Sequence, residues 1–108
     1  MTFDDYQKQS RQTAIYPNIG KNFTYPTVGL SGEVGEVANK IKKLLREDYV
    51  LSDEYRKELG KEIGDCLWYV AQLCTELGLS LEEIATENIV KVLKRAKDDK
   101  IKGSGDNR

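Results

Sequence analysis

The chain has 108 residues, of which 39% are hydrophobic and 32% charged, enough for one domain with a small core. Its 17 basic and 18 acidic residues leave a formal net charge of −1, so no basic face for nucleic acid is predicted. The longest apolar run, Cys66 to Ala71, is far too short to span a membrane. The N-terminal MTFDDYQKQS also lacks the basic start and apolar core of a signal peptide. We therefore expect a cytoplasmic protein that binds neither nucleic acid nor membranes.

Histidine is absent, which removes the commonest ligand of zinc sites and the usual base of nucleophilic triads. Any active site must therefore rely on carboxylates. The two cysteines, Cys66 and Cys74, lie eight residues apart in one predicted helix. At about 1.5 Å per residue their Cα atoms are ~12 Å apart, too far for a disulfide, so we interpret both as buried thiols.

The apolar residues repeat at helical spacing along most of the chain, and no strand pattern is present. Thr2 and Asp5 are spaced to cap a first helix, which is followed by a turn-rich loop, YPNIGKNFTYP. Gly78 ends the third helix, and Ser80 with Glu83 forms a capping box for the fourth. The helices are expected over residues 2–15, 27–48, 52–77 and 80–97. The sequence thus predicts an all-α protein, a four- to five-helix bundle over residues 1–97 with a polar, glycine-rich tail over 98–108.

The second and third helices share a motif, LSGEVGE over residues 30–36 and LGKEIGD over residues 59–65. At roughly 100° per residue, the two carboxylates of each motif border the apolar stripe of their own helix, beside Val34 or Ile63. If the helices pack as an antiparallel hairpin, the two pairs converge at the edge of the core. The four carboxylates are Glu33, Glu36, Glu62 and Asp65.

Four converging carboxylates repel one another unless hard divalent cations bind between them, which indicates Mg²⁺, with Mn²⁺ as a possible substitute. Such ions keep open positions for phosphate oxygens, so a nucleotide or other polyphosphate is the expected substrate class. Glycines in the motifs, Gly35 and Gly64, would let neighbouring helices approach closely. The alternative is a solvated acidic face that forms salt bridges with lysines such as Lys40, Lys43 or Lys61.

The segments GEVGE and EIGDCLWYV, with Asn88, Lys91 and Arg95 in the fourth helix, resemble the MazG-like nucleotide pyrophosphohydrolases. The resemblance covers roughly residues 25–97 and implies the fold of the all-α NTP pyrophosphatase group. It also implies that four residues bind Mg²⁺ and carry the catalysis: Glu33, Glu36, Glu62 and Asp65. Many members place a further glutamate directly before the first ligand, where this chain has Gly32.

The resemblance implies hydrolysis of (deoxy)nucleoside triphosphates to the monophosphate and pyrophosphate, usually as house-cleaning of the nucleotide pool. The metal would activate a water, and one carboxylate would accept its proton. Family members form dimers or tetramers, and a homo-oligomer suits the small core of this chain.

Asn88, Lys91 and Arg95 follow i, i+3, i+7 spacing, so all three can point toward bound phosphates. Alternatively, the two basic residues simply favour the C-terminal half of their helix. Tyr69 lies four residues after Asp65, where its ring can stack on a base or pack in the core or an interface. Trp68 faces the other way and is expected to pack within the bundle or between subunits.

The segment from Lys102 to Arg108 is either a lid over bound phosphates or a solvated terminus. Two other functions remain open at this stage. The chain could be a non-enzymatic helical interaction module with an acidic docking face, or a metal-dependent hydrolase of another phosphorylated nucleotide such as an alarmone. Release of pyrophosphate from a nucleoside triphosphate distinguishes these alternatives.

Overall fold

The computed structural model describes residues 1–47 and 50–102, with side chains up to residue 100. All regular structure in this part of the chain is helical, which confirms the all-α prediction. The helices are α1 (Phe3–Arg11), α2 (Thr24–Arg46), α3 (Asp53–Glu76) and α4 (Leu81–Lys102). None of these four helices has both the length and the apolar character that crossing a bilayer requires.

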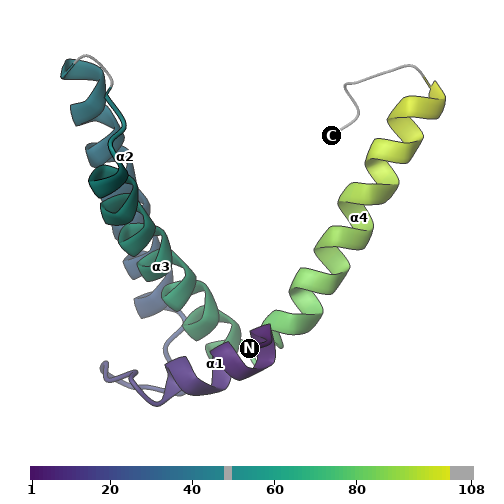
Figure 1. Ribbon diagram of the computed structural model, residues 1–108. Helices are drawn as coiled ribbons and strands as arrows, with labels where there is room; N and C mark the ends of the chain where they lie inside the picture. The colour runs from purple at the N-terminus through teal and green to yellow at the C-terminus, as the bar shows by residue number, and fades with distance from the viewer. Residues whose placement is uncertain (48–49, 103–108) are drawn as a thin grey trace.

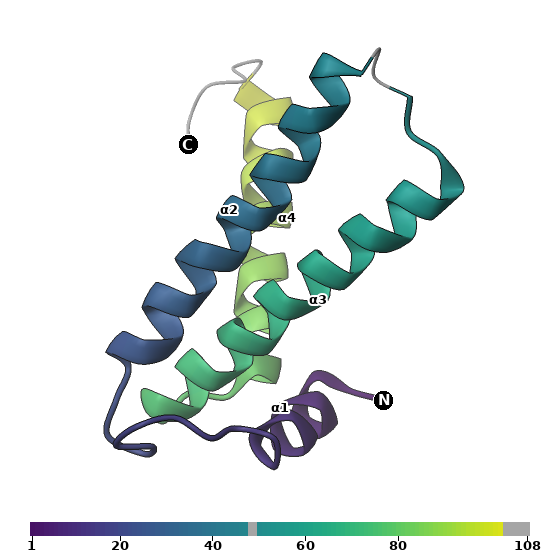
Figure 2. The ribbon, with the colours of Figure 1, turned by 90° about the vertical axis from the view of Figure 1, so that its left-hand side faces the viewer.

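The helices are arranged as a V, with extents of 49 × 40 × 26 Å (Figure 1). The antiparallel hairpin of α2 and α3 forms one arm, α4 forms the other, and α1 lies across the base. Figure 2 shows α2 and α3 adjacent in the hairpin and α1 crossing beneath them. The first turn of α4 is fixed at the base, while the rest of the helix diverges from the hairpin.

The helix ends follow the local signals of the sequence. Thr2 and Asp5 form a complete capping box at the start of α1. Gly78 adopts a φ of +69° after α3, where the Leu79 N–H donates to the Cys74 carbonyl at 2.8 Å. This is a Schellman motif, which needs a residue that tolerates positive φ. The Ser80 hydroxyl then accepts the backbone N–H of Glu83 at 3.2 Å at the start of α4.

Two helix ends differ from the expected bounds. α1 ends at Arg11 rather than near residue 15, and α4 continues to Lys102 rather than ending near residue 97. Residues 98–102 of the expected tail are therefore helical. The remainder of the expected lid, residues 103–108, lies outside the described residues.

The core of the described residues is small and lies at the base of the V. Ala71 and Cys74 of α3 pack with Leu81 of α4, and Tyr6 and Val70 pack against this cluster. Burial of these side chains fixes α1 and the start of α4 on the end of α3. Cys66 and Cys74 are both free thiols, as expected, but only Cys74 is fully buried.

The expected core stripe of the hairpin is partly exposed. Val34 retains 53% of its accessible surface and Ile63 retains 58%, because α4 does not cover this face of α2 and α3. Leu44, further along α2, is buried at 3%. The single chain thus leaves apolar surface exposed beside the carboxylate motifs on the hairpin arm.

The close helix approach that we expected at Gly35 and Gly64 is not present among the described residues. A Cβ added at either position would meet nothing within 4 Å. The close approach occurs at Gly29 instead, where a Cβ would overlap the ring of Tyr69. Gly29 therefore allows the start of α2 to lie directly against α3.

The loop between α1 and α2 is held by Glu76, the last residue of α3. Its side chain is fully buried and accepts four hydrogen bonds at 2.6–2.8 Å. The donors are the Arg11 guanidinium, the Tyr16 hydroxyl and the backbone N–H groups of Gly20 and Asn22. Burial raises the pKa of Glu76, but these hydrogen bonds outweigh it and lower the pKa to about 2. This anchor positions the start of α2.

Candidate metal and nucleotide site

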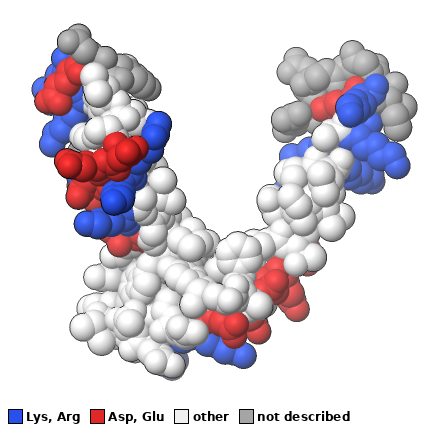
Figure 3. Space-filling view, viewed as in Figure 1, with Lys and Arg blue, Asp and Glu red and all other residues white. Residues whose placement is uncertain are grey.

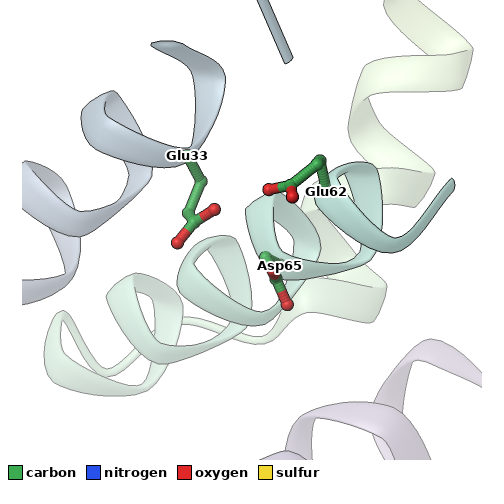
Figure 4. Close-up of side chains that lie close together, drawn as sticks. All are labelled: Glu33, Glu62 and Asp65. Carbon is green, nitrogen blue, oxygen red and sulfur yellow. The ribbon is translucent and has the colours of Figure 1, made fainter. Parts of the chain in front are cut away.

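The repeated motifs bring three carboxylates together on one edge of the hairpin. Glu33 projects from α2 toward Glu62 and Asp65 of α3 (Figure 4). One carboxylate oxygen from each residue lies within 4.8 Å of the others. The expected convergence of the two motifs is thus found for these three residues.

The cluster has no internal counter-charge in the described part of the chain. No lysine or arginine there forms an ion pair with Glu33, Glu62 or Asp65, and Lys61 instead lies 3.7 Å from Glu58. Burial and the charges of the neighbouring carboxylates raise the pKa of Glu33. The three residues therefore offer oxygen ligands and a concentrated negative charge, which fit a hard divalent cation such as Mg²⁺ or Mn²⁺.

Glu36, the fourth expected ligand, is not part of this group of three. Its side chain is exposed on α2, one turn after Glu33, and its charge contributes to the raised pKa of Glu33. Burial and the charges of Glu33 and Asp65 raise the pKa of the Cys66 thiol.

The residues expected to bind phosphates lie on the other arm of the V. Asn88, Lys91 and Arg95 are all exposed on α4, and the V separates them from the carboxylates of their own chain. Asn88 and Lys91 line a shallow cavity of 270 Å³ with Ile84 and Glu87. Figure 3 shows acidic and basic side chains mixed on the hairpin arm, and basic side chains together with some acidic ones on the α4 arm. The structure of the single chain does not bring the expected phosphate-binding residues and the carboxylates together.

Tyr69 is half-buried against α2 rather than extended into solvent. Its ring lies over Gly29 and makes an edge-to-face contact with Trp68, with centroids 5.1 Å apart. Burial, Tyr25 and the charges of Glu33 and Asp65 raise the pKa of the Tyr69 hydroxyl, which places it near the cluster. Trp68 packs within the chain, as expected, and its indole N–H donates to the Thr13 hydroxyl at 2.8 Å.

Tyr6 is a neighbour of the cluster that the helical register did not indicate. Burial and the charge of Asp65 raise the pKa of the Tyr6 hydroxyl. Tyr6 lies on α1, outside the two matching motifs, so periodicity within α2 and α3 could not connect it to Asp65. The pairing depends on how α1 crosses α3.

The described residues thus combine an all-helical fold with a cluster of oxygen ligands between two antiparallel helices, an arrangement that can bind a hard divalent cation. The MazG nucleotide pyrophosphohydrolase domain matches residues 24–99, so the chain belongs to this family. A full-length relative is the Gene 37 protein of Mycobacterium phage L5, which is 45% identical over 114 aligned residues covering 100% of both chains. No solved structure matches the chain.

Proposed function

We propose that the chain hydrolyses (deoxy)nucleoside triphosphates to the nucleoside monophosphate and pyrophosphate in a Mg²⁺-dependent reaction. The observation that carries the proposal is the cluster of Glu33, Glu62 and Asp65, because it combines three oxygen ligands without a counter-charge. Glu36, one turn from Glu33, completes the proposed set of four ligands. Removal of non-canonical or surplus nucleotides in the cytoplasm is the cellular role that this activity serves.

In this reaction a water oxygen attacks the α-phosphorus, and the bond from that phosphorus to the bridging oxygen breaks. Glu33, Glu36, Glu62 and Asp65 would hold a divalent ion, Mg²⁺ or Mn²⁺, which when bound would neutralise charge on the triphosphate and lower the pKa of the attacking water. One of the four carboxylates would accept the proton of the water. The products are the monophosphate and pyrophosphate.

The proposed assembly is a homo-oligomer, a dimer or tetramer, in which α4 of a second copy packs on the hairpin. Two observations support it. Leu93 is 62% exposed on α4, and Val34 and Ile63 are similarly exposed on the hairpin. Such packing would place Asn88, Lys91 and Arg95 beside a triphosphate bound on the neighbouring chain. Sedimentation velocity tests this assembly, and a monomer throughout the micromolar range would contradict it.

The function is tested with a panel of canonical and modified nucleoside triphosphates in millimolar MgCl₂. Equal amounts of pyrophosphate and monophosphate are expected from at least one substrate, with none after chelation by EDTA. A preference for one substrate would also assign the base and sugar that the site selects. Hydrolysis of an alarmone with all triphosphates left intact, or no hydrolysis at all, would contradict the proposal.

A further inference from the structure

The ring of Tyr69 on α3 lies against Gly29 on α2, where an added Cβ would overlap it. Gly29 is four residues before Glu33, and Tyr69 is four residues after Asp65. Residues four apart lie on the same face of a helix, ~6 Å apart along its axis. The contact between Gly29 and Tyr69 therefore lies one turn from the carboxylate cluster, in the same interface between α2 and α3, on the side toward the base of the V (Figure 2).

The Tyr69 ring is fixed in this position by its surroundings. The rings of Trp68 and Tyr69 make an edge-to-face contact, with centroids 5.1 Å apart and an interplanar angle of 90°. Trp68 is itself anchored, because its indole N–H donates to the Thr13 hydroxyl at 2.8 Å. A ring held in this way is a rigid spacer between two helices. A larger residue at position 29 would therefore move α2 away from α3 rather than fit beneath the ring.

A second contact joins the same two helices on the other side of the cluster. The Tyr55 hydroxyl donates to the Lys40 carbonyl at 2.6 Å. Lys40 lies seven residues after Glu33, and Tyr55 lies seven residues before Glu62. The cluster thus lies between two contacts that connect α2 with α3. Because helices bend only gently over a few turns, a change of distance at one contact is transmitted to the carboxylates between them.

We propose that Gly29 and Tyr69 are positioning residues of the metal site, whose contact sets the distance from Glu33 to the carboxylates on α3 and thereby the size of the preferred cation. The inference rests on the proposed function, because it concerns the divalent ion of the same site. Mg²⁺ needs oxygen ligands at about 2.0–2.1 Å in nearly octahedral geometry, whereas Ca²⁺ accepts about 2.3–2.6 Å and more variable geometry. A larger distance between the helices therefore weakens binding of Mg²⁺ more than binding of Ca²⁺.

The test measures metal binding without substrate. Electron paramagnetic resonance of free Mn²⁺ gives the Kd of that ion, and competition gives the Kd values of Mg²⁺ and Ca²⁺. Gly29→Ala adds the overlapping Cβ, so it should weaken Mg²⁺ binding about tenfold and Ca²⁺ binding by no more than about threefold. A loss of stability alone would weaken both ions equally. The ratio of the Mg²⁺ Kd to the Ca²⁺ Kd therefore isolates the positioning role.

Gly32→Ala is the matched control, because Gly32 lies on the same helix and a Cβ there meets nothing within 4 Å. Both substitutions give a similar gain in helix propensity, so only the overlap with Tyr69 distinguishes them. The control should leave the ratio of the two Kd values unchanged. Tyr69→Phe keeps the ring and should also retain the wild-type ratio.

Tyr69→Leu tests the same contact from α3 and serves if Gly29→Ala impairs folding. Without the ring the distance between the helices is no longer fixed, so this variant should also lose Mg²⁺ affinity relative to Ca²⁺. The double variant Gly29→Ala with Tyr69→Leu has room for the new Cβ, so it should bind Mg²⁺ within about threefold of the wild type.

An unchanged ratio in both single variants, or a double variant that binds Mg²⁺ more weakly than either, would overturn the inference. A wild type that binds no Mn²⁺ would overturn it as well. If the ratios change as expected but the wild type releases no pyrophosphate from any triphosphate, the inference holds and the proposed function is wrong.

Discussion

The carboxylates in the middle of the hairpin and the carboxylate at its end have opposite environments. Glu76 is buried with four hydrogen-bond donors, and its pKa is lowered to about 2. Glu33 faces Glu62 and Asp65 and forms no ion pair with a described lysine or arginine. Burial together with the charges of these two carboxylates raises the pKa of Glu33. Both sites place acidic groups against the same helix, α3, yet only one of them is electrostatically satisfied by the protein itself.

The difference separates a structural carboxylate from a functional cluster. Ionisation of Glu76 favours folding, because its pKa in the folded protein is below the ordinary value. Ionisation of Glu33 opposes folding, because its pKa is above the ordinary value. A carboxylate whose ionisation opposes folding in the free protein, but which can bind a cation, is typical of a binding site.

The largest expected effect is on turnover. Asp65→Asn or Glu62→Gln should lower kcat by roughly 10²–10³-fold, because metal activation supplies several kcal/mol of barrier reduction and each ~1.4 kcal/mol is a factor of ten. Glu58→Gln is the control, since Glu58 lies on the same helix but pairs with Lys61 at 3.7 Å. Steady-state pyrophosphate release measures the effect. Near-normal rates in both cluster variants would remove these residues from the site.

The next effect concerns the structural carboxylate. Glu76→Gln should lower the free energy of unfolding at pH 7 by about 3 kcal/mol, because it removes the charge of a fully buried carboxylate that pairs with the partly exposed Arg11 guanidinium and accepts three further hydrogen bonds. Asp53→Asn, which removes a partner of exposed Arg56, should cost at most about 1 kcal/mol. Urea unfolding monitored by circular dichroism compares the two. Equal, small losses would show that the anchor contributes little.

The same residue predicts a pH dependence. Because the pKa of Glu76 is lowered from 4.5 to about 2, its contribution is fully present above pH ~4.5 and is lost as the pH falls toward 2. The wild type should therefore lose stability in this window, and Glu76→Gln should lose less. Urea midpoints measured between pH 6 and pH 2.5 give the comparison. Parallel pH profiles would argue against the lowered pKa.

The smallest expected effect is on thermal stability, and its measurement needs no substrate. In EDTA, Asp65→Asn should be as stable as the wild type or more stable, because it removes one repelling charge. Mg²⁺ at a hundredfold excess over its Kd should stabilise the wild type by about 2.7 kcal/mol, and the variant should lose most of that gain. Thermal melts with EDTA and with metal measure both. If Asp65→Asn is destabilised in EDTA and gains as much from metal as the wild type, Asp65 is a structural residue.

Local signals explain which parts of the fold were predictable. The caps at Thr2, Gly78 and Ser80 depend on residues within one turn. Those at Thr2 and Gly78 form as expected, and at Ser80 the hydroxyl accepts the Glu83 N–H, which is one half of the expected capping box. The meeting of Glu33 with Glu62 was also predictable, because helical register and a hairpin connection suffice to bring them together. These features need no knowledge of the remaining helices.

Contacts between distant segments explain what the sequence did not indicate. Glu76 is 54 to 65 residues away from its four donors, two of which are backbone N–H groups without a side-chain signal. The direction of α4 was not predictable either, because its apolar residues fit a bundle within one chain as well as a contact with another copy. Periodicity identifies an apolar face but not the surface that covers it.

Glu76, the buried acceptor at the end of α3, also indicates where an independently folding unit begins. The family match starts at residue 24, yet the donors to Glu76 lie between Arg11 and Asn22. A truncated chain that begins at residue 24 would keep the carboxylate motifs and lose the groups that neutralise Glu76. It would also uncover Ala71 and Cys74 by removing α1. The smallest autonomous unit therefore includes the segment before the recognised domain.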